Sequence, residues 1–198
     1  VEFKAGTGFE DIVGCKPDEI FKKGVSLAFV PEDRLGMGLV GSLDMVDNML
    51  IRSYKNNKGP LVDRKTPKQV CDELIEALEI VTPGTSTPVR RLSGGNVQKV
   101  LLGREIHYNP KVLMVAYPVR GLDINSSFKI YDLLNEQKKK GVAVLFVGED
   151  LDVLMEISDR IMVLCGGAVS GIVDPRTATK EDVGLLMVHA GGEKEAKA

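Results

Sequence analysis

From about residue 96 onward, short apolar runs alternate with stretches of helical periodicity, and this alternation is the feature that most constrains the fold. Apolar runs at 112–116 and 142–147 each follow such a stretch, and another at 25–31 ends in proline. Strands that alternate with helices form βαβ units, whose strands pair in parallel and are covered on both faces. The sequence therefore predicts an α/β domain in which these three runs lie side by side as parallel strands.

Polar residues that stand just before helical stretches predict where helices begin. Thr66 and Gln69 have the spacing of a capping box for a helix over 65–81. Asp123 can cap a helix to about residue 140, because its carboxylate can accept hydrogen bonds from the first N–H groups.

Shorter elements are predicted toward both ends of the chain. Residues 17–23 and 150–157 are expected to form short helices, and two apolar runs around Gly166-Gly167 are typical of a hairpin. Thr179 with Asp182 is expected to open a last helix.

The stretch from about 40 to 95 lacks the alternation of the rest. It is expected to be a helical insert on the α/β body, preceded by a glycine-rich loop at 32–43. Residues 1–190 are interpreted as one partial domain, and the polar tail 191–198 is expected to be disordered.

Composition excludes several classes of protein. The chain has 198 residues, 43% of them apolar, and a formal net charge of -2, so nothing points to nucleic acid or an anionic membrane surface as a partner. No apolar run reaches the ~18 residues that a membrane-spanning helix needs. The three cysteines, Cys15, Cys71 and Cys165, form no CxxC pair and are expected to be reduced thiols of a cytosolic protein.

The triplet Ser93-Gly94-Gly95 stands directly before a predicted helix and is the clearest candidate for an anion site. Glycines leave backbone N–H groups bare, and a helix start carries a positive dipole end. Ser93 can either cap the helix or donate its hydroxyl to a phosphate oxygen. A plain cap with a flexible hinge remains the simpler interpretation of the triplet alone.

The context of this triplet resembles ABC transporter ATPases, from their signature motif to their D-loop. The stretch LSGGNVQKVLLGREIHYNPKVLMVAYPVRGLD carries the resemblance, which covers residues 25–190. Further pieces look like the second ATPase half of tandem subunits in importers of simple sugars and nucleosides. They are FVPEDR at 29–34, TPVRRLSGGN at 87–96, PVRGLD at 118–123, EDLDVLMEISDRIMVL at 149–164 and EDVGLLM at 181–187.

The resemblance implies a P-loop NTPase-like ABC ATPase fold, and ATP bound with Mg²⁺ between two such domains. One domain supplies the phosphate loop, and the other closes its signature serine and glycines on the γ-phosphate. In that second role Asn96 and Gln98 would support the turn, and the D-loop aspartate would lie near the attacking water. The residues assigned to the nucleotide in this way are Ser93, Gly94, Gly95, Asn96, Gln98 and Asp123.

The phosphate loop of the family is missing from the sequence. No G-x-x-x-x-G-K-[ST] occurs, and Gly6-Thr7-Gly8 has no lysine and serine after it. In relatives the loop lies upstream of the FVPEDR segment, so Val1 is expected to lie inside the domain, which lacks its N-terminal phosphate-loop part. A natural deletion is the alternative.

Hydrolytic positions also depart from the family pattern. Ala116 and Tyr117 stand at the two positions where the resemblance to hydrolytic ABC domains implies Asp-Glu. Alanine cannot position Mg²⁺, and tyrosine is a poor general base at neutral pH. Glu149 replaces the switch histidine, and Glu32 replaces the Q-loop glutamine. Glu32 and Glu149 are equally well explained as solvated loop carboxylates. No catalytic residue is therefore expected in this chain, and its hydrolytic site is interpreted as degenerate.

No metal site is expected. His107 and His189 have no ligand partner at metal spacing and are interpreted as structural or surface residues. Arg120 either braces the D-loop or reaches a phosphate. Three carboxylates are interpreted as solvated helix charge, namely Asp152, Glu156 and Asp159.

Two functions follow from these observations. The first is the ATPase component of an importer for simple sugars or nucleosides, peripheral on the cytoplasmic face of the membrane and inactive as an isolated chain. It would act with a partner ATPase domain, transmembrane permease subunits that touch residues 34–50 and the insert, and indirectly a solute-binding protein. The alternative is a non-catalytic dimerisation module that binds no nucleotide alone. A soluble ABC ATPase of DNA repair or translation is disfavoured by the near-neutral charge.

Overall fold

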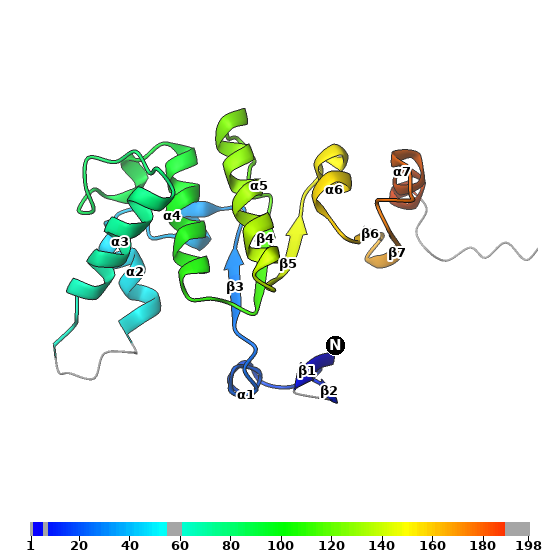
Figure 1. The fold of residues 1–198 in the computed structure, drawn as a ribbon, viewed down its shortest axis with the longest axis horizontal. Helices are drawn as coiled ribbons and strands as arrows, with labels where there is room; N and C mark the ends of the chain where they lie inside the picture. Colours follow the sequence, from blue (N-terminus) through cyan, green and yellow to red (C-terminus); the bar gives the residue numbers. More distant parts are fainter. Residues whose placement is uncertain (1, 6–7, 55–60, 189–198) are drawn as a thin grey trace, which may run out of the picture. The chain divides into compact units, whose positions relative to one another are not determined.

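The computed structural model describes residues 2–5, 8–54 and 61–188 of the chain. The polypeptide forms two compact units, residues 1–147 and 148–198 (Figure 1). None of the described helices is long and apolar enough to cross a membrane. The tail predicted at 191–198 lies outside the described residues.

A parallel sheet of three strands forms the centre of the first unit. The strands β3 (Leu27–Val30), β4 (Val112–Ala116) and β5 (Ala143–Val147) lie in the order β3-β4-β5, and both pairs are parallel (Figure 1). Ala28 pairs with Leu113, which pairs in turn with Val144. The predicted side-by-side arrangement of the three apolar runs is confirmed.

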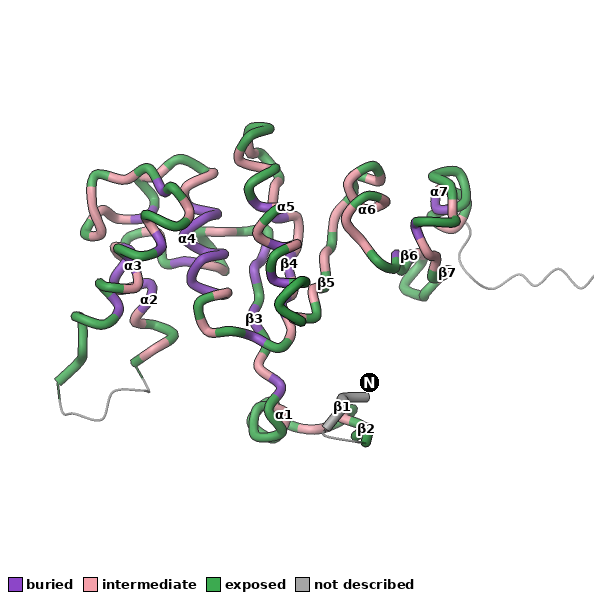
Figure 2. Tube along the Cα trace, in the orientation of Figure 1, coloured by how far each residue is buried: buried purple, intermediate pink, exposed green. Residues whose placement is uncertain are grey.

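Only one face of this sheet is buried. Ala28 and Val30 of β3, and Leu113 and Val115 of β4, are at most 1% exposed. Successive side chains of a strand point to opposite faces, and the residues between these four are far more open. Leu27, Phe29, Leu145 and Val147 are 39% to 53% exposed. Figure 2 shows buried and exposed positions alternating along β3. The predicted cover on both faces was therefore wrong for the described residues.

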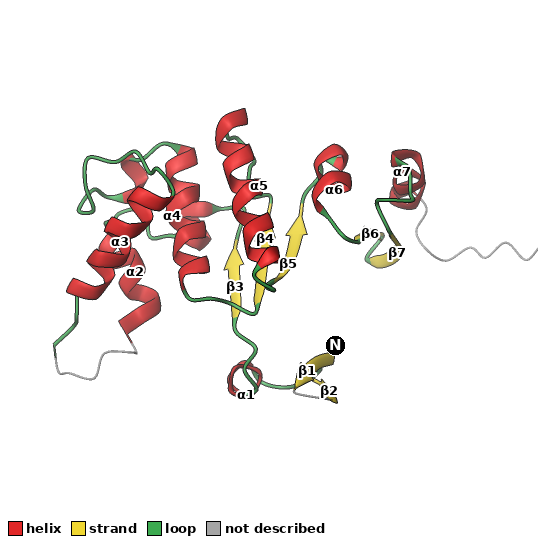
Figure 3. Cartoon of the chain, in the orientation of Figure 1, coloured by secondary structure: helices red, strands yellow, loops and turns green. Residues whose placement is uncertain are grey.

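Two long helices pack on the buried side of the sheet. α4 (Gly94–His107) contacts β3, and α5 (Ile124–Lys139) contacts β5 (Figure 3). Asp123 caps α5 by accepting from the Ser126 amide at 2.9 Å, as its position before the helix predicted. Gly141, with φ +84°, follows the end of α5, where a left-handed backbone favours glycine.

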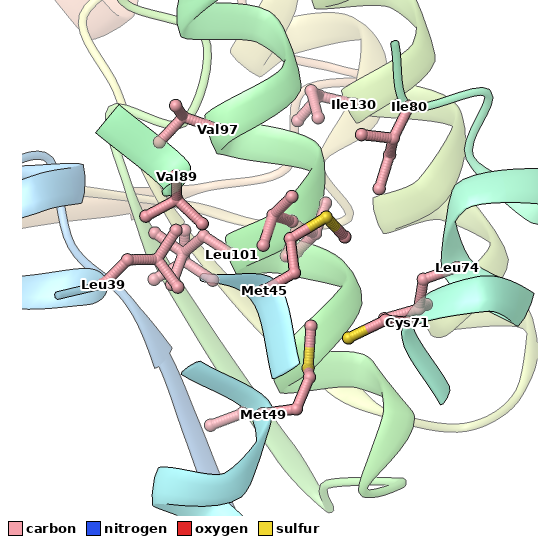
Figure 4. Close-up of a cluster of buried hydrophobic side chains, with 14 of the residues drawn as sticks. Leu39, Met45, Met49, Cys71, Leu74, Ile80, Val89, Val97, Leu101 and Ile130 are labelled. Carbon is pink, nitrogen blue, oxygen red and sulfur yellow. The ribbon is translucent and has the colours of Figure 1, made fainter. Parts of the chain in front are cut away.

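Helices and turns without a regular strand form the described part of residues 40–95. They are α2 (Met45–Ser53), α3 (Lys65–Ala77) and the 3-10 turn η3 (Val89–Arg91). Met45, Met49, Cys71 and Leu74 from these helices join Leu101 of α4 in one core (Figure 4). Burial raises the pKa of the Cys71 thiol to about 12, and all three cysteines are free.

The predicted capping box at α3 was wrong. The helix begins at Lys65, one residue before the predicted cap Thr66. Asp63 supplies the oxygen instead, accepting from the amides of Lys65 at 2.8 Å and Thr66 at 3.2 Å. Gln69 donates to Glu73 rather than reaching back to the start of the helix. An aspartate two residues before the helix can satisfy the same orphan donors as a serine or threonine cap.

The glycine-rich segment predicted as a loop contains a π-helical turn, η1 (Arg34–Gly38). Asp33 caps it by accepting from the Gly36 amide at 2.8 Å. A Cβ at Gly38 would lie 2.7 Å from a methyl of the fully buried Leu101. The turn can therefore pack this closely on α4 only because residue 38 has no side chain.

The ends of the chain form smaller elements. β1 (Glu2–Ala5) and β2 (Gly8–Asp11) pair antiparallel, which the sequence did not predict, and the predicted helix α1 (Pro17–Lys22) is confirmed.

The second unit contains the predicted hairpin between two helices. α6 (Leu151–Ile157) precedes the antiparallel strands β6 (Ile161–Cys165) and β7 (Ala168–Val173), and α7 (Lys180–Val188) follows them. The Thr179 hydroxyl accepts from the Asp182 amide at 3.2 Å, and the Asp182 carboxylate accepts from the Thr179 amide at 2.8 Å. This reciprocal pair is the helix start that the sequence predicted.

Candidate nucleotide-binding site

Ser93 caps the amino end of α4. Its extended backbone (φ −64°, ψ 157°) turns the chain into the helix, and its Oγ accepts from the Asn96 amide at 3.4 Å. The Asn96 side chain donates to the same oxygen at 2.8 Å. Ser93 and Gly94 are exposed, so the hydroxyl, the first amides and the positive end of the helix dipole all face outward. This combination can bind an anion such as a phosphate group.

The glycines at this helix start have different neighbours. A Cβ at Gly94 would lie 3.3 Å from the end of the Arg34 guanidinium, whereas one at Gly95 would lie 2.8 Å from Ser126 Oγ. Gly95 therefore lets the start of α4 approach the start of α5 closely.

Asp123 lies next to this contact. Its carboxylate accepts from the Ser126 amide at 2.9 Å and from the Ser126 hydroxyl at 2.7 Å. These hydrogen bonds lower the pKa of Asp123 below its usual range, the bond from the Ser126 hydroxyl most of all. The structure thus brings residues 93–95 and Asp123 together through Ser126.

Asn96 and Gln98 are placed very differently. The Asn96 carboxamide bridges Ser93 and the loop after α3, since its Oδ1 accepts from the Val81 amide at 2.9 Å. Gln98 is fully buried, and neither its amide nitrogen nor its oxygen has a hydrogen-bond partner among the described residues. Gln98 therefore makes no hydrogen bond to the turn at 93–95.

A second set of contacts joins the segments that follow β3 and β4. Arg120 forms an ion pair with Glu32, and its guanidinium lies 5.9 Å from the centre of the Tyr117 ring. Arg34 donates to the backbone carbonyl of Arg120, and burial lowers the pKa of Arg34. The Arg120 side chain thus joins the segment after β3 to the segment after β4. Glu32 is paired rather than simply solvated.

The positions at the end of β4 do not provide a metal site. Ala116 offers only a methyl group, and Tyr117 has a positive φ of 47°, with its amide donating to the Val147 carbonyl at 2.8 Å. A non-glycine residue in this region is strained by about 1–3 kcal/mol. Over the described ranges no three His, Cys, Asp or Glu residues gather as metal ligands. Mg²⁺ takes oxygen ligands, and the methyl group of Ala116 offers none.

The remaining candidates include Glu149, His107 and Asp152. Glu149 belongs to the second unit, where it precedes Asp150, the cap of α6. His107 stacks edge-on against Tyr108, and Asp152 pairs with Lys180, whereas His189 lies outside the described residues.

Arg34 and Ser126 were not predicted as site residues. Ser126 follows Asp123 at the spacing of a cap and its partner, which is the one sequence signal that could have indicated it. Arg34 carries no such signal, because its contacts come from segments distant in the sequence.

Solved structures share this fold. The ATP-binding cassette MJ0796, in a dimeric post-hydrolysis state bound to ADP and Pi, matches with a TM-score of 0.67 and 23% identity over 83% of this chain and 70% of that chain. A nucleotide-free cassette from an ABC transporter matches with a TM-score of 0.65 and 20% identity over 89% of this chain and 70% of its own. The chain therefore has the α/β fold of an ATP-binding cassette.

Curated relatives narrow this class. The chain is 40% identical over 159 residues to the galactose/methyl galactoside import ATP-binding protein MglA of Shigella boydii serotype 4 (strain Sb227) and to that of Escherichia coli (strain K12). The match covers 79% of this chain but 31% of each relative, so the chain spans about a third of their length. No protein-family model matches. The chain is thus homologous to part of the ATP-binding protein of a sugar-import ABC transporter.

Proposed function

We propose that the chain supplies the signature side of a composite ATP site in an importer of simple sugars or nucleosides. The start of α4 is the observation that carries this proposal, since it presents an exposed hydroxyl and two glycine amides beside Asp123. The import function named for the MglA relatives supports the transport role. The motifs at 29–34 and 181–187 support its assignment to the second cassette of a tandem subunit.

The proposed ligand at this site is the γ-phosphate of ATP bound by a partner cassette. The Ser93 hydroxyl and the amides of Gly94 and Gly95 would donate to the phosphate oxygens, and the helix dipole would add to the attraction. A fixed donor of this kind is worth about 10²–10³ in rate when it stabilises charge in a transition state. ATP binding would hold the two cassettes together, and hydrolysis would release them.

The hydrolytic site of this chain itself is proposed to be degenerate. Ala116 cannot position Mg²⁺ through a water, and the ring of Tyr117 lies 5.9 Å from the Arg120 guanidinium as a packing group. Glu32, at the Q-loop position, is already paired with Arg120. One composite site of the complete transporter would therefore be competent, and the other would hold nucleotide at most.

The proposed partners are a second ATPase domain, transmembrane permease subunits and, through these, a solute-binding protein. The segment 34–50 is the candidate contact with the permease, because its π-helical turn leaves Leu35 and Met37 exposed. This arrangement would place the chain at the cytoplasmic face of the membrane.

A non-catalytic dimerisation module is the second candidate function. The exposed apolar face of the sheet favours it, since exposed apolar patches commonly mark contacts with other proteins. A titration with MgATP of the chain mixed with a partner cassette that carries a phosphate loop separates the two, because a pure dimerisation module would not increase nucleotide binding by the partner.

Transport measured in proteoliposomes tests the first proposal. We expect Ser93→Arg to abolish ATP-driven uptake, because the long cation would fill the space that the phosphate needs. Tyr117→Ala should leave most of the uptake, since residue 117 belongs to the site that does not hydrolyse. The reverse order of the two variants would refute the proposed asymmetry, as would ATP hydrolysis by the isolated chain that Ser93→Ala removes.

A further inference from the structure

The Asn96 side chain has a defined orientation between Ser93 and Val81. Its carboxamide accepts from the Val81 amide at 2.9 Å and donates to Ser93 Oγ at 2.8 Å. A backbone N–H can only donate, so the carboxamide oxygen must face Val81 and the NH₂ group must face Ser93. The network therefore excludes the flipped carboxamide, in which two donors would meet.

This orientation determines what the Ser93 hydroxyl can do. Its oxygen receives hydrogen bonds from the Asn96 side chain at 2.8 Å and from the Asn96 backbone at 3.4 Å. A hydroxyl has two acceptor lone pairs and one hydrogen to donate, so both acceptor sites are used. No residue in the described part of the chain accepts from this hydroxyl, and Ser93 is exposed. The hydroxyl is left to donate to a group outside the chain.

The loop that carries Val81 is itself held in place by two helices. Lys99 of α4, only 7% exposed, donates to the Glu79 carbonyl at 2.9 Å, and Lys129 of α5 pairs with the Glu79 carboxylate. Glu79 has a positive φ of 49°, which turns the chain sharply after α3. Two helices thus anchor the loop that orients Asn96.

We infer that Asn96 is a positioning residue that presents the Ser93 hydroxyl as a hydrogen-bond donor to a phosphate oxygen. The inference rests on the proposed function, in which Ser93 contacts the γ-phosphate of a partner cassette. Asn96 itself touches no phosphate in this account. It acts by occupying the acceptor sites of the hydroxyl with its own donors.

Asn96→Asp tests this role with little change in shape. A carboxylate can still accept from the Val81 amide, so the anchor to the loop after α3 is kept. It cannot donate, so the Ser93 hydroxyl would turn and donate to the carboxylate instead. The hydrogen meant for the phosphate would then be lost, although Ser93 is still present.

The readout is the MgATP-driven association of the chain with a partner cassette that carries a phosphate loop. We expect Ser93→Ala and Asn96→Asp each to weaken this association about 10- to 100-fold, the usual effect of losing a hydrogen bond to a charged group. The double variant should associate no more weakly than the weaker-binding single variant, because both changes remove the same donor, the Ser93 hydroxyl. Thermal unfolding of each variant, with Asn96→Ala for comparison, reports whether the loop anchor is intact.

The double variant also separates this role from simple charge repulsion. A new carboxylate that only repelled ATP would weaken association further in the Ser93→Ala background, and such additivity would overturn the inference. Unchanged association of Asn96→Asp beside a weakened Ser93→Ala would overturn it as well. In NMR spectra, Ser93→Ala should shift the Asn96 side-chain amide signal, and an unmoved signal would contradict the hydrogen bond. If Ser93→Ala leaves association unchanged, the proposed function fails, and the inference fails with it.

Discussion

Gly94 and Gly95 are adjacent at the start of α4, yet they differ in what a side chain would meet. At Gly94 a methyl group would approach only the flexible end of Arg34, at 3.3 Å. At Gly95 it would lie 2.8 Å from Ser126 Oγ and 3.3 Å from Ser126 Cβ. Asp123 holds that hydroxyl, so Ser126 cannot simply rotate away.

Gly95→Ala is therefore expected to destabilise the fold by about 1–3 kcal/mol, the usual result of overpacking. Gly94→Ala, the matched control, should be neutral or slightly stabilising, because alanine is the better helix former. Urea unfolding of both variants measures the difference. Equal midpoints would mean that α4 and α5 are not in close contact at this point.

At the scale of the element, Asp123 links the start of α5 to pH. Hydrogen bonds from Ser126 lower its pKa in the folded chain. A carboxylate whose folded pKa is depressed stabilises the fold above its unfolded pKa of about 3.9 and loses that contribution as pH falls through the folded value. The helix start should therefore be most stable at neutral pH and weaken in acid.

We expect Asp123→Ala to lower the urea midpoint at pH 7. The difference in urea midpoint between this variant and the native chain should narrow below about pH 4, where the carboxylate becomes protonated. Asp123→Asn is the control, because asparagine caps helices about as well but does not titrate. The difference in urea midpoint between Asp123→Asn and Asp123→Ala should stay constant over the same pH range. If the difference in urea midpoint between the native chain and Asp123→Ala widens in acid, the ionised Asp123 does not stabilise the start of α5.

At the scale of the whole molecule, the open face of the sheet has the widest consequence. Leu27, Phe29, Leu145 and Val147 leave apolar surface in water, and such surface drives association. We expect the chain to self-associate at high concentration, as measured by light scattering. Combining Phe29→Lys with Leu145→Lys should shift it toward monomer.

Phe128→Lys is the matched control for that experiment. Phe128 is 61% exposed, but it lies on α5 rather than on the sheet. The control should therefore leave the association unchanged. A native chain that stays monomeric at every concentration, or an equal response to both changes, would contradict a role for the sheet face.

The sequence by itself determined the features that depend on neighbouring residues. Periodicity predicted the three parallel strands, and local caps at Asp123 and Thr179 predicted helix starts, because a side chain two or three positions from an orphan amide can reach it. The same local logic failed at Thr66, where the nearby Asp63 supplied the hydrogen bonds.

Only the tertiary structure decided the contacts that join distant segments. Arg34 meets the carbonyl of Arg120, 86 positions away, and Asn96 meets the Val81 amide across the loop after α3. No local pattern encodes such pairs, since they depend on how α4, α5 and the sheet pack. For the same reason Gln98, expected at the signature turn, lies in the core, and one sheet face expected to be covered is open. Side-chain alternation predicted which residues share a face of the sheet, whereas packing alone decided which face is buried.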